Sequence, residues 1–208
     1  MLKVFLCGEG NNDLGTRWHD PPGDARGVIE ALLARARPSG WRVGKAIDWK
    51  SIRKYRAGAA RNTPSHFDVR NLQALVQLAY EEACEMLVFL RDCDGEDGRE
   101  HAVNQAVATI AELGFEDEYR YKLAIVGGVP RPNLEGWILC LLGVTRTDEM
   151  TNTRAENELK AHNIKPKSTA HYLEIADTAP LPIGDGSLAR WCSLARKTFD
   201  QLIDGVTA

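Results

Sequence analysis

A short apolar run that ends in two aspartates constrains the fold of this chain more than any other stretch. Residues 87–90 are apolar, and Asp92, Cys93 and Asp94 follow them, a pattern that predicts a buried strand ending at a solvent-facing edge. In extended backbone, residues i and i+2 project to the same face, so we expect Asp92 and Asp94 to share one pocket and Cys93 to point away. Two adjacent carboxylates repel each other, and a divalent cation would relieve that repulsion. An Asp-rich turn without a ligand is the alternative interpretation.

The N-terminus repeats this pattern of an apolar run followed by acids. Residues 2–7 predict a second buried strand, and Gly8, Glu9, Gly10 and Asp13 follow it. If both strands belong to one parallel sheet, their acids meet at the carboxyl ends of the strands, where open α/β sheets place their ligand crevice. Glu9 is therefore expected close to the two aspartates of the later strand.

The order of apolar patterns along the chain predicts an α/β fold. Strands are expected at 2–7, 41–49, 87–90 and 123–126, and helices between them at 28–36, 72–79 and 99–113. This alternation predicts right-handed crossovers and a mostly parallel sheet with helices on both faces. Further helices are expected from Pro132, around 155–161 and over 188–202. We expect residues 1–145 to form the α/β core and 146–208 a helical C-terminal extension that packs on it, with 145–186 mostly polar and irregular.

Bulk composition excludes few functions but does bear on location. The chain has 208 residues, 44% of them hydrophobic and 26% charged, and a net charge of -3, which is ordinary for one globular domain. Its five cysteines show neither metal-finger nor Cys-x-x-Cys spacing. No apolar stretch has the length of a signal peptide core or of a membrane span. The expected location is cytoplasmic, without membrane contact.

Three acidic motifs together resemble those of a known fold family. Glu9 and Asp13 fit a Glu-x-x-x-Asp motif after the first strand, Asp92 and Asp94 an Asp-x-Asp motif after a later strand, and Glu135 stands before a tryptophan at the start of a helix. This order resembles the Toprim fold, which is Rossmann-like, over roughly residues 1–145. It is most similar to Toprim nucleases of the overcoming-lysogenization-defect type and their small stand-alone relatives.

The resemblance implies a Mg²⁺ or Mn²⁺ cofactor held by these acids. Carboxylates are the hard oxygen ligands that such cations prefer. Glu9, Asp92 and Asp94 are the expected catalytic residues and metal ligands, and Asp13 and Glu135 would hold a second metal ion. For Glu135, the alternative is a favourable charge near a helix N-terminus.

One segment of the chain is strongly basic. Between residues 50 and 70 a single acid, Asp68, opposes six basic residues, which are Lys50, Arg53, Lys54, Arg56, Arg61 and Arg70. A carboxylate-rich site repels a polyanionic substrate, so we expect this segment to contact nucleic-acid phosphates. The alternative is a solvated surface loop. A smaller basic patch at Lys165 and Lys167 is the second choice for the same role.

The sequence therefore predicts a Mg²⁺- or Mn²⁺-dependent phosphodiesterase, most simply a nuclease that acts on DNA or RNA, and the resemblance suggests a setting in defence or repair. A first alternative is a non-catalytic Toprim-like subunit that binds nucleic acid or an ATPase. This chain has no phosphate-binding loop of its own, so an ATPase partner would be a separate subunit. A second alternative is a metal-dependent small-molecule phosphatase, which would need a closed pocket and no basic segment.

Overall fold

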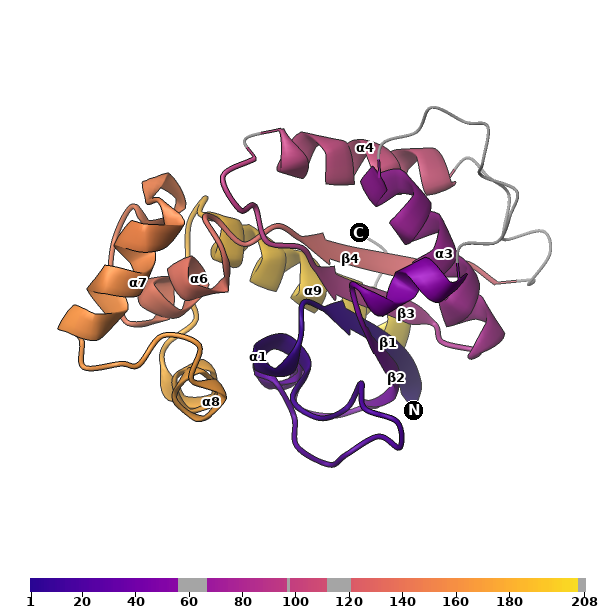
Figure 1. Cartoon of the computed structure of the whole chain (residues 1–208). Coiled ribbons are helices and arrows are strands. Elements are labelled where there is room, and N and C mark those ends of the chain that lie inside the picture. The colour runs from indigo at the N-terminus through magenta and orange to yellow at the C-terminus, as the bar shows by residue number, and fades with distance from the viewer. Residues whose placement is uncertain (56–66, 97, 112–120, 206–208) are drawn as a thin grey trace.

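The computed structural model describes residues 1–55, 67–96, 98–111 and 121–205, and its centre is a four-stranded sheet (Figure 1). The strands are β1 (Leu2–Gly8), β2 (Trp41–Asp48), β3 (Met86–Leu90) and β4 (Ala124–Gly128). They lie in the order β2-β1-β3-β4, and every neighbouring pair is parallel. The prediction of an α/β fold with a parallel sheet is confirmed.

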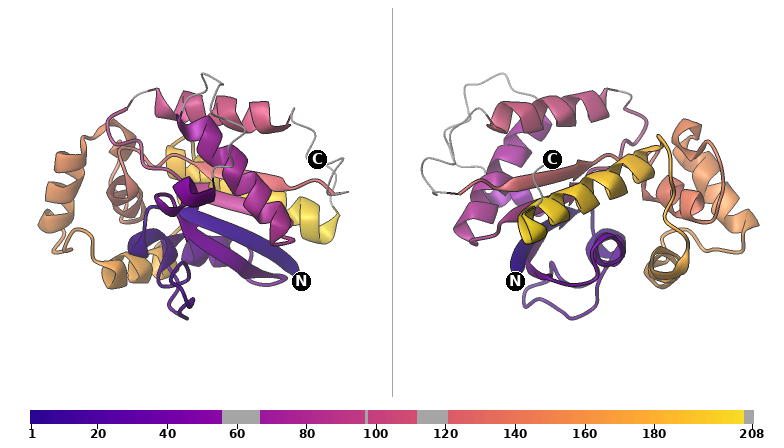
Figure 2. Two further views of the ribbon diagram at one scale, coloured as in Figure 1. Left: turned by 45° about the vertical axis from the view of Figure 1, so that its right-hand side comes forward. Right: turned by 180° about the vertical axis from the view of Figure 1, so that it is seen from behind.

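Helices cover both faces of the sheet, so its central strands are buried on both sides. Along β1, Val4 and Leu6 pack into one apolar cluster and Phe5 and Cys7 into another, the period of two expected of a strand. The first cluster includes residues of α2 (Val28–Ala36) and α9 (Ser187–Asp204). The second includes residues of α3 (Phe67–Glu81) and α4 (Arg99–Ala111). Figure 2 shows α9 and the α3–α4 pair on opposite sides of the sheet.

A group of three short helices stands beyond the carboxyl ends of the strands. These are α6 (Leu134–Leu141), α7 (Asn152–Ala161) and α8 (Thr169–Thr178), with a 3₁₀ turn, η3 (Thr147–Glu149), between the first two. We call this group the helical lobe; it lies to the left of the sheet in Figure 1. After it, α9 returns along the sheet. Buried residues of the lobe and of α9, such as Tyr172 and Phe199, belong to the same apolar cluster as β1.

The structure differs from the predicted elements at several places. Residues 145–186 are not mostly irregular, because α8 forms there on two buried residues, Tyr172 and Ala176. A four-residue helix, α1 (Asn11–Leu14), replaces part of the first loop. A 3₁₀ helix, η1 (Ser51–Tyr55), follows β2, and α3 begins at Phe67 and not near residue 72.

The last strand extends through two glycines that the sequence pattern placed at its end. A β-carbon at Gly127 would lie 2.5 Å from the ring of Phe89, and one at Gly128 would lie 2.6 Å from the ring of Trp191. Glycine is needed at both positions so that these aromatic rings can pack directly against the strand.

Within the described ranges, no helix combines the length and the apolar character that crossing a membrane requires.

Candidate metal centre

All five acids that the sequence singled out line one cleft at the carboxyl end of the sheet. The chain leaves β1 for β2 on one side and later returns to β3 on the other, so this end of β1 and β3 is a topological switch point. The cleft has a volume of about 560 Å³. Its acidic lining residues include Glu9, Asp13, Asp92, Asp94 and Glu135. A sixth acid, Glu156, also lines the cleft, and the other lining residues are Gly10, Asn11, Asn12, Trp18, Asn133, Leu134, Asn152, Lys167 and Thr169.

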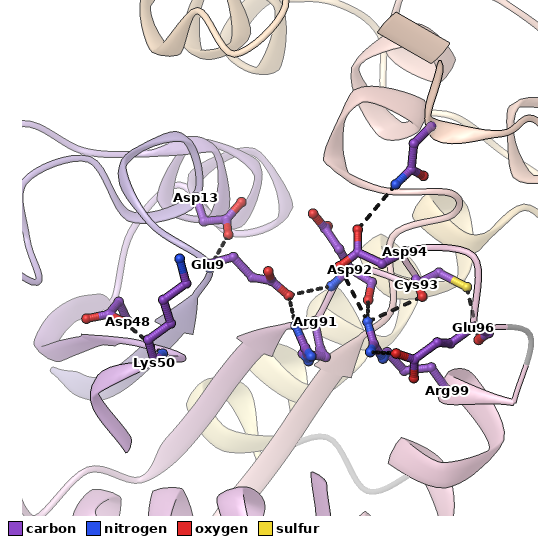
Figure 3. A network of polar contacts seen from close by, with 11 residues as sticks. Glu9, Asp13, Asp48, Lys50, Arg91, Asp92, Cys93, Asp94, Glu96 and Arg99 are labelled. Carbon is purple, nitrogen blue, oxygen red and sulfur yellow. Dashed lines mark hydrogen bonds and ion pairs between the residues drawn. The ribbon is translucent and has the colours of Figure 1, made fainter. Parts of the chain in front are cut away.

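Glu9 joins the ends of the two central strands. Its Oε1 accepts a hydrogen bond from the backbone N–H of Asp92 at 3.1 Å and another from Nη1 of Arg91 (Figure 3). The Arg91 guanidinium also lies over the ring of Trp49, 5.4 Å from its centroid, where a cation–π contact helps to hold it in place. The Glu9 carboxylate is therefore fixed beside Asp92, although 82 residues of chain separate Glu9 from Arg91.

Asp13 is buried against the end of β1. Its carboxylate accepts a hydrogen bond from the backbone N–H of Glu9, and its side chain occupies the space that a side chain at Gly8 would fill, since a β-carbon there would lie 2.5 Å from that of Asp13. The pKa of Asp13 is raised from 3.8 to about 7, chiefly by burial. The hydrogen bond from Glu9 opposes this rise in pKa, and the negative charges of Glu9 and Glu135 add to it. Near neutral pH, this carboxyl group can therefore hold or release a proton.

Asp92 and Asp94 both line the cleft, and Cys93 points away from it into the apolar cluster under α3 and α4, as predicted. The backbone does not stay extended, however: β3 ends at Leu90, and Asp94 has a left-handed φ of 52°. Burial raises the pKa of Asp92 well above its usual value, and the charges of Asp13, Glu9, Asp94 and Glu135 raise it further.

Asp94 is the most exposed of the carboxylates on the strand ends, and it contacts other parts of the fold. Its side chain accepts a hydrogen bond from Nδ2 of Asn152 at 3.3 Å and lies 3.5 Å from the guanidinium of Arg99. Asn152 is the first residue of α7. Asp94 therefore connects the end of β3 to the helical lobe.

Glu135 reaches the cleft from the first turn of α6 and is buried. Its Oε1 accepts a hydrogen bond from the hydroxyl of Tyr172 at 2.9 Å, and that hydroxyl accepts one from the backbone N–H of Lys167 at 2.8 Å. Burial raises the pKa of Tyr172, and the charge of Glu135 raises it further. The phenol therefore stays protonated and keeps donating to the carboxylate.

The donor chemistry of the cleft fits a hard divalent cation, but the side chains do not already form a coordination shell. Carboxylate oxygens suit Mg²⁺ and Mn²⁺. Besides burial, the charges of neighbouring carboxylates raise the pKa values of Asp13 and Asp92, and a cation would relieve this repulsion. Across the described ranges, no three His, Cys, Asp or Glu side chains are placed to hold a metal ion as they stand. Metal binding would therefore require some of the carboxylate side chains around Glu9 to move.

The basic segment does not contribute to the cleft lining as far as the structure describes it. Lys50, Arg53 and Lys54 are exposed and follow β2, whose end lies beside β1 through the hydrogen bond from Trp49 N to Gly8 O at 2.8 Å. Arg70 lies within α3. Arg56 and Arg61 lie outside the described residues.

The sequence analysis did not predict the uncharged polar residues that line the cleft, such as Asn12, Asn152 and Thr169, and it noticed Lys167 only as part of a basic patch. Lys167 is the one basic residue among the described residues that line the cleft, and its Nζ lies 3.5 Å from Glu156. Thr169 Oγ1 donates to Oδ1 of Asn12 at 2.7 Å, which joins α8 to α1 beside the cleft. Threonine and asparagine in polar loops give no signal that they will meet across a site.

Comparisons of the chain with protein-family models, with curated proteins and with solved structures gave no match.

Proposed function

We propose that this protein is a Mg²⁺- or Mn²⁺-dependent phosphodiesterase that acts on nucleic acid. The observation that supports this function most is the meeting of five carboxylates from three separate stretches of the chain in one cleft at the switch point of a parallel sheet. The order of these acids is also why we propose kinship with the Toprim fold. We further propose a cytoplasmic location, which the five free cysteine thiols support.

In this function, Glu9, Asp92 and Asp94 would hold the cation next to the scissile phosphate, and Asp13 and Glu135 would complete the acidic cleft. A bound Mg²⁺ or Mn²⁺ supplies Lewis-acid stabilisation of the phosphate and lowers the pKa of a bound water. Glu9 is fixed by the Asp92 amide and is the candidate for accepting a proton from the attacking water.

Two further residues of the cleft would assist at the phosphate. The ammonium group of Lys167 would bind a non-bridging oxygen, because Lys167 is the one basic residue among the described residues that line the cleft. Tyr172 would orient Glu135 through its hydroxyl.

A cleavage assay tests this proposal. Labelled single-stranded and duplex DNA and RNA are incubated with Mg²⁺, with Mn²⁺ or with excess chelator. We expect cleavage only with the cations, and we expect Glu9→Gln, Asp92→Asn or Asp94→Asn each to abolish it. Glu96→Gln is a matched control, because Glu96 belongs to the same loop but does not line the cleft. Cleavage that persists in chelator, or in the Asp92→Asn, Asp94→Asn double variant, would refute the proposal.

A metal-dependent small-molecule phosphatase is the second candidate, and the cleft itself favours it. A volume of about 560 Å³ lies within the range of small-molecule sites, and the helical lobe walls the cleft on one side. This candidate would be supported if the protein hydrolyses p-nitrophenyl phosphate in a reaction that requires Asp92 and leaves polynucleotides uncleaved.

A further inference from the structure

We propose that the cleft takes single-stranded nucleic acid and that an unpaired base lies against Trp18, an inference that rests on the proposed phosphodiesterase function. Trp18 follows α1 in the chain, and its half-buried side chain lines the same cleft as the five carboxylates. An indole beside a site that binds the reacting phosphate offers an aromatic surface on which the neighbouring base can stack.

The indole of Trp18 is held in a defined orientation. Its Nε1 donates a hydrogen bond to Oδ1 of Asn11 at 3.1 Å, and its ring forms a T-shaped pair with the ring of His19, with the ring centroids 4.8 Å apart. Nε2 of His19 lies 3.3 Å from the same Asn11 oxygen. An aromatic ring that is fixed before binding loses little conformational entropy when a base stacks on it.

The walls of the cleft favour an unpaired nucleotide over a base pair. The cleft has the size of a small-molecule site, and the hydrogen bond between Thr169 and Asn12 joins its two walls at α8 and α1. In a duplex, both faces of a base are stacked and its edge is paired, so that base cannot reach Trp18 without being flipped out. A base of a single strand has a free face and can stack while its phosphate lies at the carboxylates.

The chemistry of the contact also indicates what kind of selectivity to expect. Every base has a π-face, so stacking on an indole is tolerant of sequence. The neighbouring lining residues Asn11, Asn12 and Asn133 are uncharged and do not add to the repulsion of phosphate. We therefore infer a preference for single strands over duplexes, with little preference among sequences.

Binding measurements on variants of Trp18 test the inference. The Asp92→Asn chain is used throughout with Mg²⁺, because it reduces the repulsion of phosphate and is not expected to cleave. The probes are fluorescein-labelled oligothymidylate, an abasic strand of the same length and a duplex, each measured by fluorescence anisotropy. Trp18→Leu should weaken binding of oligothymidylate by about 5- to 150-fold and leave the abasic strand nearly unchanged. Trp18→Phe, which keeps an aromatic face, should retain most of the affinity.

Trp41→Leu is the matched control, since Trp41 is another half-buried indole but packs against Phe199 and does not line the cleft. It should leave the ratio of oligothymidylate to abasic affinity unchanged. The inference is overturned if Trp18→Leu and Trp18→Phe weaken both strands equally, or if the duplex binds as tightly as the single strand.

The failure of this inference and the failure of the proposed function are distinguishable. A chain that cleaves in a metal- and carboxylate-dependent way, with no base-dependent effect of Trp18, retains the function and loses the inference. A chain that binds oligothymidylate through Trp18 but cleaves nothing with Mg²⁺ or Mn²⁺ loses the phosphodiesterase assignment and keeps the base contact.

Discussion

Replacing Asp13 by asparagine should stabilise the metal-free protein at neutral and higher pH. The pKa of Asp13 is about 7 in the folded protein and near 3.8 in the unfolded chain, so between these values the folded state holds one proton more than the unfolded state. Stability then falls as the pH rises, by about 1.4 kcal/mol per pH unit, and the fall ends just above pH 7. From about pH 5 to about pH 8, the loss from this one group is roughly 2 to 3 kcal/mol. Asparagine cannot ionise, so the variant should not show this loss of stability. Its Oδ1 can still accept the hydrogen bond from the backbone N–H of Glu9.

Urea unfolding in excess chelator at these two pH values measures the effect. Between about pH 5 and about pH 8, the free energy of unfolding should fall by roughly 2 to 3 kcal/mol less in the variant than in the natural chain. Asp24→Asn is the control, because Asp24 is a solvent-exposed carboxylate on a loop, and it should behave as the natural chain does. In the natural chain, Mg²⁺ at about 100 times its dissociation constant should restore about 2.7 kcal/mol at the higher pH. Equal losses in the natural chain and in Asp13→Asn would show that Asp13 is not a buried carboxyl with a raised pKa.

Three further changes test other parts of the structure. Tyr172→Phe removes the hydrogen bond to Glu135 and should lower the free energy of unfolding by about 1 to 3 kcal/mol while weakening Mn²⁺ binding, as calorimetry would show. Gly127→Ala places a methyl group against a buried ring of β3 and should cost about 1 to 3 kcal/mol by urea unfolding. Changing Arg53 and Lys54 to alanine should reduce the salt slope of single-strand binding by about 1.4 if both meet phosphates, and an unchanged slope would leave them as surface charges.

The sequence determined the strands and most of the helices because their patterns are local. Alternation of apolar residues along β1 and helical spacing along α2, α4 and α9 depend only on which residues a short segment must bury. Local patterns did not predict helices that bury few residues or that are short. Helix α8 buries only Tyr172 and Ala176, and α1 is a single turn, so neither has enough periodicity to be seen.

For the candidate site too, some features could be predicted from the sequence and others depend on the tertiary structure. The acids after β1 and β3 could be predicted to meet, because parallel strands bring their carboxyl ends to one edge of a sheet. The burial that raises the pKa of Asp13 could not be predicted from the sequence, since this burial depends on the close approach of α1 to Gly8. The left-handed backbone of Asp94 also escaped prediction, because an Asp-Gly turn allows several conformations.

The local patterns of the sequence therefore predict an α/β chain with acids at the ends of its strands. The residues that surround those acids follow from tertiary packing, which brings Tyr172 and Lys167 from the lobe and Trp18 from the loop after α1 to the cleft. Tyr172 contacts Glu135 across 37 residues of the chain, and the lobe that carries Tyr172 and Lys167 reaches the cleft because α8 packs on α1 and α2. A local pattern records which face of a segment is buried, but it does not record which other segment will cover that face.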